Sequence, residues 1–259
     1  MTECIHGFDE GMCDICFPRV APQPVSALAS PPSRPASRAS ATATRPKRVA
    51  PPAGRPATVP PFGARRLYHW THLTNLESIL LDGDLRSRAS GVEPDVDVAA
   101  PLVRDLRARA DVGDGRTVTD FVPFAASPDS DRWAEVRTGA EGAQWSAAAR
   151  ATSATDYALL VVTGKELGAD VVVADGDASA PLTAFTIGEP AKAVARLTRT
   201  DPDLVAAEVL VPGPVPLSAV SLIAVANEPA RARVRGMFRD VEGAAPRVVV
   251  HPPWFVPAS

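Results

Sequence analysis

The stretch RLYHWTHLTNLESILLDG, residues 66–83, joins a short strand-like segment directly to a segment with helical spacing. Residues 66–70 have the length and the bulky composition of a β-strand. Residues 75–81 repeat apolar side chains at intervals of three and four, which is typical of one face of an α-helix. We expect Thr74 to cap the start of this helix and Gly83 to lie near its end. The chain is therefore expected to enter its folded part through a strand followed at once by a helix.

Beyond this pair, the sequence contains many Val- and Leu-rich runs of strand length and few helical segments. Residues 99–110 and 231–238 are expected to form helices. Strands are expected at residues 117–124, 157–162, 170–174, 206–211, 220–226 and 247–251. Several strands with few helices between them predict an α+β domain with a mixed or antiparallel core.

The composition of the 259 residues fits one domain of moderate size with appendages. Hydrophobic residues make up 46% of the chain but aromatic residues only 5%, so the core must consist mainly of Val, Leu, Ile and Ala. No apolar run approaches the roughly 20 residues that span a bilayer. The first residues lack the basic and apolar regions of a secretory signal. We therefore expect no membrane contact and an intracellular, reducing compartment such as the cytoplasm.

The sequence divides into three zones: residues 1–18, residues 19–63 and residues 64–259. The middle zone is rich in Pro, Ala, Ser and Arg, a composition that cannot bury enough apolar surface to offset the entropy of ordering it. We expect it to be a disordered linker. No acidic residue occurs between Asp14 and Glu77, whereas nine basic residues do. Such a segment can attract polyanions such as nucleic acid, although a linker kept soluble by its charge is equally compatible with the sequence.

All three cysteines of the chain lie in the first zone, where Cys4, His6, Cys13 and Cys16 form the pattern C-x-H-x6-C-x2-C. Zinc takes four sulfur or nitrogen ligands in a tetrahedron, and the segment supplies four. We predict a structural zinc site that folds only with its metal. A disordered tail with chance cysteines is the alternative. A redox pair is less favoured because no sheet and helix surround it to tune a thiol.

Two groups of polar residues stand out within the third zone. His69, Thr71, His72 and Asn75 lie around the junction of the predicted strand and helix. Glu208 lies within AAEVLVPGPVPL, residues 206–217, where its neighbours are otherwise apolar. A carboxylate is costly to bury unless it is paired or open to a cleft. These residues are therefore candidates for a functional site, although a buried histidine and an edge-strand glutamate facing solvent are common without any function.

The same segments resemble the DarT family of NAD-dependent DNA ADP-ribosyltransferases, over roughly residues 65–256. The block RLYHWTHLTNLESILLDGDLRSR is similar to the opening strand and helix of that family, which hold the nicotinamide and ribose of NAD. By this resemblance, His69, Trp70 and Thr71 contact NAD, and Ser78 on the following helix is a further candidate.

Two more blocks carry the resemblance. LVRDLRARADVGDGRTVTDFVPF, residues 102–124, is similar to the family's helix with an active-site arginine and the strand after it. Arg107 is the best match for that arginine, and Arg109 is the alternative. AAEVLVPGPVPLSAV is similar to the strand that carries the catalytic glutamate, which implies that Glu208 is catalytic. A carboxylate that binds a ribose hydroxyl can stabilise the oxocarbenium-like state in which the bond to nicotinamide breaks.

The resemblance implies an ADP-ribosyltransferase fold with two small packed sheets around an NAD cleft. It also implies a toxin that transfers ADP-ribose from NAD to a base of single-stranded DNA and is neutralised by a macrodomain antitoxin. One segment departs from the family: AASPDSDRW, residues 125–133, places Asp129 where an arginine is typical.

Because of that departure, an acceptor other than DNA stays open at this point. An ADP-ribosyltransferase acting on RNA or protein is the first alternative. The second is a non-catalytic, zinc-containing nucleic-acid-binding protein in which the zinc segment and the basic linker are the working parts.

Overall fold

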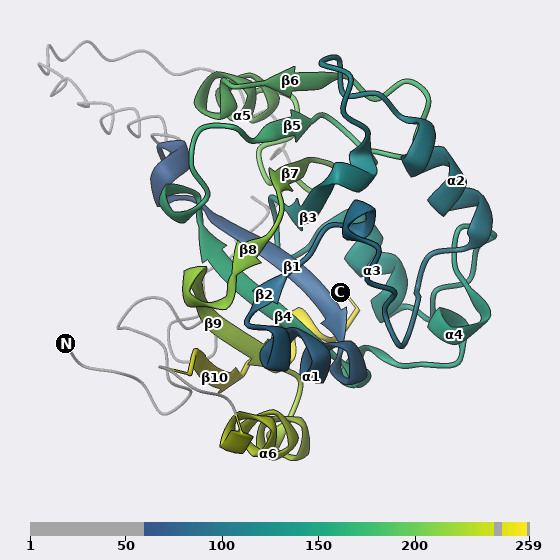
Figure 1. Cartoon of the computed structure of the whole chain (residues 1–259), viewed down its shortest axis with the longest axis vertical. Helices are drawn as coiled ribbons and strands as arrows, with labels where there is room; N and C mark the ends of the chain where they lie inside the picture. Colours follow the sequence, from purple (N-terminus) through teal and green to yellow (C-terminus); the bar gives the residue numbers. More distant parts are fainter. Residues whose placement is uncertain (1–59, 241–244, 258–259) are drawn as a thin grey trace, which may run out of the picture. The chain divides into compact units, whose positions relative to one another are not determined.

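The computed structural model describes residues 60–240 and 245–257 (Figure 1). The four residues predicted to bind zinc and nearly all of the predicted linker lie outside the described residues. Within the described ranges, each helix is too short or too polar to cross a bilayer.

Eight strands form one mixed sheet in the order β10-β9-β4-β1-β3-β7-β5-β6. Their bounds are β1 Arg66–His72, β3 Phe121–Ala125, β4 Tyr157–Thr163, β5 Val172–Ala174, β6 Phe185–Ile187, β7 Glu208–Pro212, β9 Val220–Val225 and β10 Arg247–Val250. All neighbouring strands are antiparallel except β9 and β10, which are parallel. The prediction of an α+β domain with a mixed core is confirmed.

The sheet is nearly divided at its centre, between β1 and β3. These two strands pair only through Tyr68 and Ala125, whereas β1 pairs with β4 along its whole length. The prediction of two small packed sheets is therefore corrected to one sheet whose two four-stranded halves meet at a single pair of residues. A separate two-stranded sheet is formed by β2, Asp84–Leu85, and β8, Val215–Pro216.

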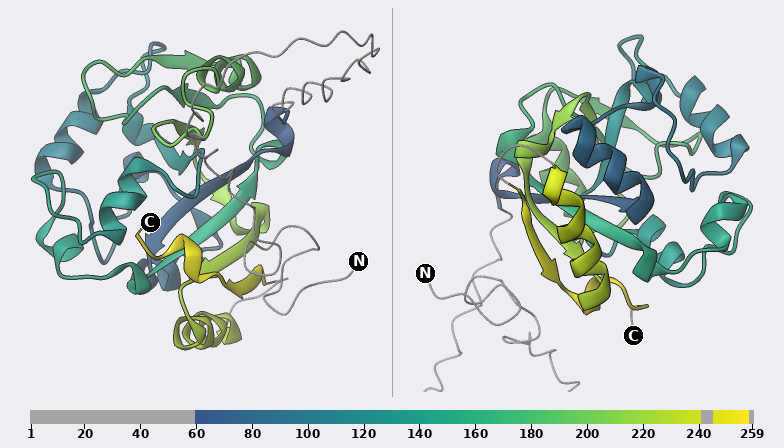
Figure 2. Two further views of the ribbon diagram at one scale, coloured as in Figure 1. Left: turned by 180° about the vertical axis from the view of Figure 1, so that it is seen from behind. Right: turned by 60° about the horizontal axis from the view of Figure 1, so that its bottom comes forward.

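The helices pack against the strands or lie to one side of the sheet (Figures 1 and 2). They are α1 Leu73–Asp82, α2 Pro101–Arg109, α3 Asp131–Arg137, α4 Ala147–Arg150, α5 Pro190–Leu197 and α6 Glu228–Met237. Short 3-10 turns are η1 Phe62–Ala64, η2 Arg88–Ser90, η3 Val118–Asp120, η4 Ala154–Asp156, η5 Gly164–Glu166, η6 Leu217–Ala219, η7 Phe238–Asp240 and η8 Pro252–Trp254. Helix α6 contacts β9 and β10, whereas α5 contacts β5 and β6.

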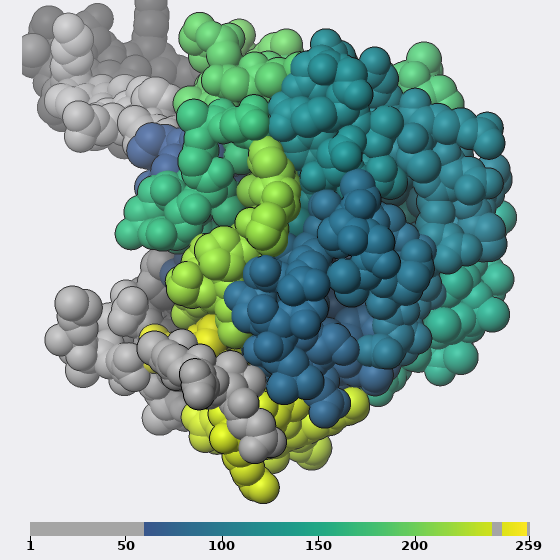
Figure 3. Space-filling view, in the orientation of Figure 1, coloured from purple at the N-terminus to yellow at the C-terminus, as the bar shows by residue number. Residues whose placement is uncertain are grey.

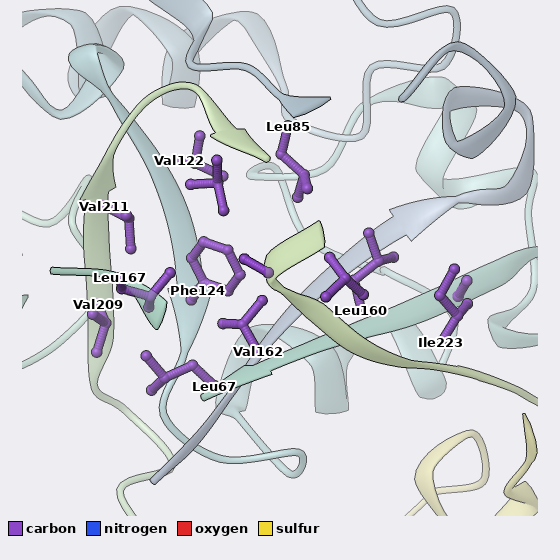
Figure 4. Packing of buried hydrophobic residues seen from close by; sticks show 14 of the residues in the cluster. Leu67, Leu85, Val122, Phe124, Leu160, Val162, Leu167, Val209, Val211 and Ile223 are labelled. Carbon is purple, nitrogen blue, oxygen red and sulfur yellow. The ribbon is translucent and has the colours of Figure 1, made fainter. Parts of the chain in front are cut away.

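One face of the sheet carries the main hydrophobic core, which is largely aliphatic as predicted. Figure 4 shows side chains of this core, among them Leu67, Phe124, Leu160, Val209 and Ile223. Buried residues of α1, α5 and α6 belong to the same core. On the other face, the rings of Trp70 of β1, Tyr157 of β4 and Trp133 of α3 pack together with that of Trp145 and form a second, aromatic layer.

The first helix begins earlier than predicted. Its N-cap is His72, whose Nδ1 accepts a hydrogen bond from the backbone N–H of Thr74 at 3.2 Å, so Thr74 lies inside the helix. Gly83 ends the helix as expected, with a φ of 76° that a residue with a side chain rarely adopts. Strand β1 therefore passes into α1 through a histidine cap, and this junction fixes the direction of both elements.

The predicted strand at residues 117–124 is half wrong. Residues Val118–Asp120 form a 3-10 turn closed by a capping box, in which Thr117 and Asp120 bond each other's backbone N–H groups. Only Phe121–Ala125 forms the strand. Helices α3, α4 and α5 and strand β6 had no counterpart in the prediction, and each of them is short, with three to eight residues.

Candidate active site

A pocket of about 880 Å³ opens where the sheet divides between β1 and β3. Its floor is formed by β1 and β3, and its walls by α1, α2, α3, the segment 92–99 and the loop 177–181. Figure 3 shows the surface in the orientation of Figure 1, where the segments from α1 to α2 lie beside one another. A cavity of this volume is within the range of small-molecule and cofactor sites.

Glu208, the first residue of β7, forms a two-pronged ion pair with Arg107 of α2 in this pocket. Arg107 Nη2 lies 2.7 Å from Glu208 Oε2, and Arg107 Nη1 lies 3.3 Å from Oε1. The backbone N–H of Ala178 donates a further hydrogen bond to Oε1 at 3.3 Å. Because both side chains are largely buried, at 19% and 12% exposure, the two charges depend on each other for compensation.

Asp177 extends this pair into a chain of alternating charges. Its Oδ1 lies 3.6 Å from Arg107 Nη1, and its Oδ2 lies 3.1 Å from Nη1 of Arg132 on α3. The guanidinium of Arg132 lies over the ring of Trp145, with its Cζ 4.6 Å from the ring centroid. Two positive and two negative side chains thus alternate in a row that faces one pocket: Arg132, Asp177, Arg107 and Glu208.

The pKa values of two members follow from this arrangement. Burial lowers the pKa of Arg107, but the charge and hydrogen bonds of Glu208, aided by Asp177, outweigh burial and raise it above its usual range. Burial raises the pKa of Asp177, but the charge of Arg132, two hydrogen bonds from Ser179 and the charge of Arg107 bring it below its usual range. Both groups are therefore ionised at neutral pH.

His69 enters the same pocket from β1. Its Nδ1 lies 2.9 Å from the carbonyl oxygen of Pro123, and because a carbonyl only accepts, Nδ1 carries the proton. Burial lowers the pKa of His69, although the hydrogen bond to Pro123 partly offsets it. The imidazole is therefore neutral at pH 7, and its Nε2 has a lone pair that can accept a hydrogen bond from a ligand.

The side chains of His69 and Glu208 leave their strands on opposite faces of the sheet. Tyr68 pairs with Ala125, and Ala125 pairs with Glu208, so these three side chains share one face. His69 follows Tyr68 and points to the other face, where its ring lies 5.6 Å from that of Phe124. Both nevertheless line one pocket, because β1 and β3 part after a single pair of residues.

The other residues of the His-Trp-Thr run also reach the pocket. Thr71 is nearly buried in its wall. Trp70 lies beside Trp133 and Trp145, with ring centroids 5.8 and 6.0 Å away. Asn75 lines the pocket as well, and its side-chain amide donates to and accepts from the backbone of Val96, with both distances 2.8 Å. Asn75 thereby fixes the segment that forms the outer wall.

Three residues singled out in the sequence do not reach the pocket. Ser78 is exposed on α1 and donates a hydrogen bond to Asp95 at 3.1 Å. Arg109 is exposed at the end of α2, so the structure favours Arg107 over Arg109 as the site arginine. Asp129 is exposed and forms an ion pair with the buried Arg137, in which its Oδ1 lies 2.8 Å from Arg137 Nη1.

Sequence reasoning missed Asp177, Arg132 and Glu135, which all line the pocket. Glu135 accepts hydrogen bonds from Gln144 Nε2 at 2.6 Å and from Trp145 Nε1 at 2.7 Å, and so holds the ring on which Arg132 lies. No local pattern distinguishes these residues, because each meets its partner only in the folded domain. Within the described residues, no group of three or more His, Cys, Asp or Glu side chains is placed to hold a metal ion.

Comparison with known proteins places this geometry in context. The family model described as "DarT: ssDNA thymidine ADP-ribosyltransferase, DarT" matches residues 68–256. A search of curated proteins gives no match.

Among solved structures, Thermus sp. 2.9 DarT in complex with ADP-ribosylated ssDNA is similar, with a TM-score of 0.61 and 20% identity over 74% of this chain and 96% of that chain. The same Thermus protein in complex with NAD+ has a TM-score of 0.56 and 20% identity, over 74% and 98% of the two chains. Thermosipho africanus DarTG in complex with ADP-ribose has a TM-score of 0.58 and 19% identity, over 74% and 51%. At these identities the structures share the fold.

Proposed function

The chain belongs to the DarT family of ssDNA thymidine ADP-ribosyltransferases and is an NAD-dependent enzyme that modifies single-stranded DNA, and we propose that the pocket between β1 and β3 is its active site. The observation that carries this proposal is the ion pair of Glu208 with Arg107 in the same pocket as His69. NAD is a substrate here, since it is consumed in the reaction.

In the proposed reaction, the bond between the ribose C1′ and the nicotinamide nitrogen of NAD breaks. Its electron pair leaves with nicotinamide, which becomes neutral, and positive charge develops on the ribose. Glu208 accepts a hydrogen bond from a ribose hydroxyl and offsets that charge. A nucleophilic atom of the thymine base gives up its proton to solvent water and bonds to C1′. The fixed charge of Arg107 stabilises the negative charge that develops on the base as the proton leaves.

His69, Trp70 and Thr71 are proposed to hold the nicotinamide end of NAD. The free Nε2 of His69 is an acceptor for the carboxamide N–H of nicotinamide, and the Thr71 hydroxyl can donate or accept beside it. The indole of Trp70 offers an apolar surface in the same part of the pocket. Ser78 is left out of this set because it bonds to Asp95 outside the pocket.

The acceptor is tested by mass spectrometry after incubation of the protein and NAD with separate oligonucleotides. We expect an added ADP-ribose on a single-stranded DNA that contains thymidine, and none on a DNA of the same length without thymidine. Parallel reactions with RNA and with a protein mixture test the other acceptor classes. Modification of RNA or protein in place of DNA would contradict the proposed assignment.

The neutral state of His69 gives a pH prediction. Since burial lowers its pKa from about 6.5, the KM for NAD should stay constant between pH 8 and about pH 6.5, and rise only at lower pH when Nε2 is protonated. The same lowered pKa means that the unfolded chain takes up the proton first as pH falls. His69 therefore contributes stability that is present above about pH 6.5 and lost below it.

Steady-state kinetics of the wild type and of His69→Gln across this range check the prediction. The variant should have a higher KM for NAD at pH 7.5 and should lose the increase in KM below pH 6.5. His72→Gln is the matched control, because His72 is the adjacent capping histidine whose pKa is also lowered by burial. If the rise in KM below pH 6.5 disappears in the His72 variant and persists in the His69 variant, the titrating residue is His72 and the prediction is wrong.

Residues 1–63 are proposed to form an accessory region, followed by the transferase domain at 64–259. The pattern of Cys4, His6, Cys13 and Cys16 supports a structural zinc site. The basic linker supports attraction of the DNA backbone to the domain at 64–259, which has 26 acidic residues against 20 basic ones. Zinc content of the full-length protein, compared with that of Cys13→Ser, tests the site. If wild-type protein that has been purified without a chelator contains no zinc, the proposed site is refuted.

The chain is further proposed to act as the toxin of a pair whose partner is a macrodomain antitoxin. The similar Thermosipho africanus DarTG structure supports this, because the match covers only 51% of that chain and the protein binds ADP-ribose. Removal of ADP-ribose from the modified oligonucleotide by a macrodomain protein is the corresponding test.

A further inference from the structure

Asp177 lies between the two arginines of the pocket and has no part in the reaction as described so far. Its loop joins β5 to β6, and the turn around it is fixed by local hydrogen bonds. Ser179 donates to Asp177 Oδ1 from its backbone N–H at 2.8 Å and from its hydroxyl at 2.7 Å. Thr183 donates to the carbonyl oxygen of Asp177 at 2.6 Å. The carboxylate is therefore held in place before any substrate arrives.

The two guanidinium groups depend on this carboxylate to different degrees. Arg107 has Glu208 as its main partner and lies 3.6 Å from Asp177. Arg132 has Asp177 at 3.1 Å as its one acidic partner among the described residues, and the face of Trp145 as its other support. If Asp177 were neutral, two positive groups in a restricted pocket would lose the negative charge between them, and each would be free to shift towards the remaining carboxylates.

We propose that Asp177 is a positioning residue of the transfer reaction: it keeps Arg132 against Trp145 and helps to keep Arg107 at Glu208. This inference rests on the proposed function of the pocket. Asp177 acts through the arginines and does not itself touch the reacting atoms. Its effect should appear in kcat more than in KM for NAD, because exact placement of charge matters most where charge develops in the transition state.

The central test is Asp177→Asn in the full-length protein, assayed with NAD and a single-stranded oligonucleotide that contains thymidine. We expect kcat to fall by about 10- to 100-fold and the KM for NAD to change by less than about threefold. Asp177→Glu keeps the charge and should recover most of the lost kcat. The matched control is Asp175→Asn on the same loop, where an exposed carboxylate accepts a hydrogen bond from Ala184 N at 2.8 Å; its kcat should stay within about twofold of the wild type.

A double-mutant cycle separates positioning from a merely structural role. If Asp177 acts through Arg132, the loss in kcat of Asp177→Asn combined with Arg132→Gln should be smaller than the product of the two single losses. The fluorescence of Trp145 gives a second readout. Release of Arg132 from the ring should change the emission spectrum in Asp177→Asn, and this change should disappear when Trp145→Phe is added.

Several results would overturn the proposal: an unchanged kcat in Asp177→Asn, no recovery in Asp177→Glu, or losses that simply multiply in the double variant. If Asp177→Asn does not fold, Ser179→Ala takes its place, since it removes one hydrogen bond to Oδ1 and keeps the charge. A several-fold lower kcat then supports the proposal, and an unchanged kcat refutes it. Failure of the wild type to modify any oligonucleotide would refute the proposed function itself, which separates the two failures.

Discussion

Replacing Glu208 by Gln is expected to lower kcat for ADP-ribosylation of single-stranded DNA by about 100- to 1000-fold. Gln keeps the size of the side chain and one hydrogen-bond acceptor but removes the negative charge that faces the developing positive charge of the ribose. Release of nicotinamide and modification of the oligonucleotide should fall together, because both follow from cleavage of the same bond.

The substitution should also reduce stability, because Arg107 then loses its main counter-ion in a largely buried position. We expect a loss of roughly 1–3 kcal/mol in the free energy of unfolding, measured by thermal or denaturant unfolding. Glu189→Gln is the control, since Glu189 is exposed and pairs with Lys192 on the surface. A variant that keeps its stability and its full kcat would show that Glu208 is an ordinary strand residue.

Replacing Arg107 by Lys is expected to lower kcat by about 100-fold while the KM for NAD changes less. Lysine keeps the positive charge but cannot reproduce the two-pronged contact, in which two guanidinium nitrogens reach both oxygens of Glu208. The control is a variant of another arginine on the same helix. Arg109→Lys alters an exposed residue outside the pocket, so its kcat should stay within about twofold of the wild type.

This pair of variants also decides between the two arginines that the sequence left open. A larger loss for Arg109→Lys than for Arg107→Lys would mean that α2 turns its other side to the substrate during the reaction. In that case the ion pair with Glu208 would belong to the free protein only.

The local sequence was sufficient for most of the elements. Strand-like composition located β1, helical spacing located α1, and the Val- and Leu-rich runs located β4, β7, β9 and β10 to within a few residues. Such patterns work because a strand or helix must bury one face wherever it lies in the fold. Some elements were missed altogether, and others were misplaced at their ends. His72 caps α1 because its side chain accepts a hydrogen bond from Thr74 N, and residue spacing alone does not decide between His72 and Thr74 as the cap.

Resemblance to a family of transferases singled out Glu208, Arg107 and His69, which meet in one pocket. Glu208 and Arg107 form an ion pair although they lie 101 residues apart in the chain. The sequence left the choice between Arg107 and Arg109 open, because both lie near the end of the same helix. Only the direction of α2 relative to β7 decides which of them reaches the carboxylate.

What the sequence determined by itself, then, was most of the longer strands and helices, the family and the residue types that carry the chemistry. The tertiary structure decided the division of the sheet between β1 and β3, which brings His69 and Glu208 into one cavity from opposite faces. It also decided the roles of Asp177 and Arg132, whose partners come from other parts of the chain. The physical reason is that charge pairing and pocket shape depend on contacts between distant segments, whereas strand and helix formation depends on neighbours along the chain.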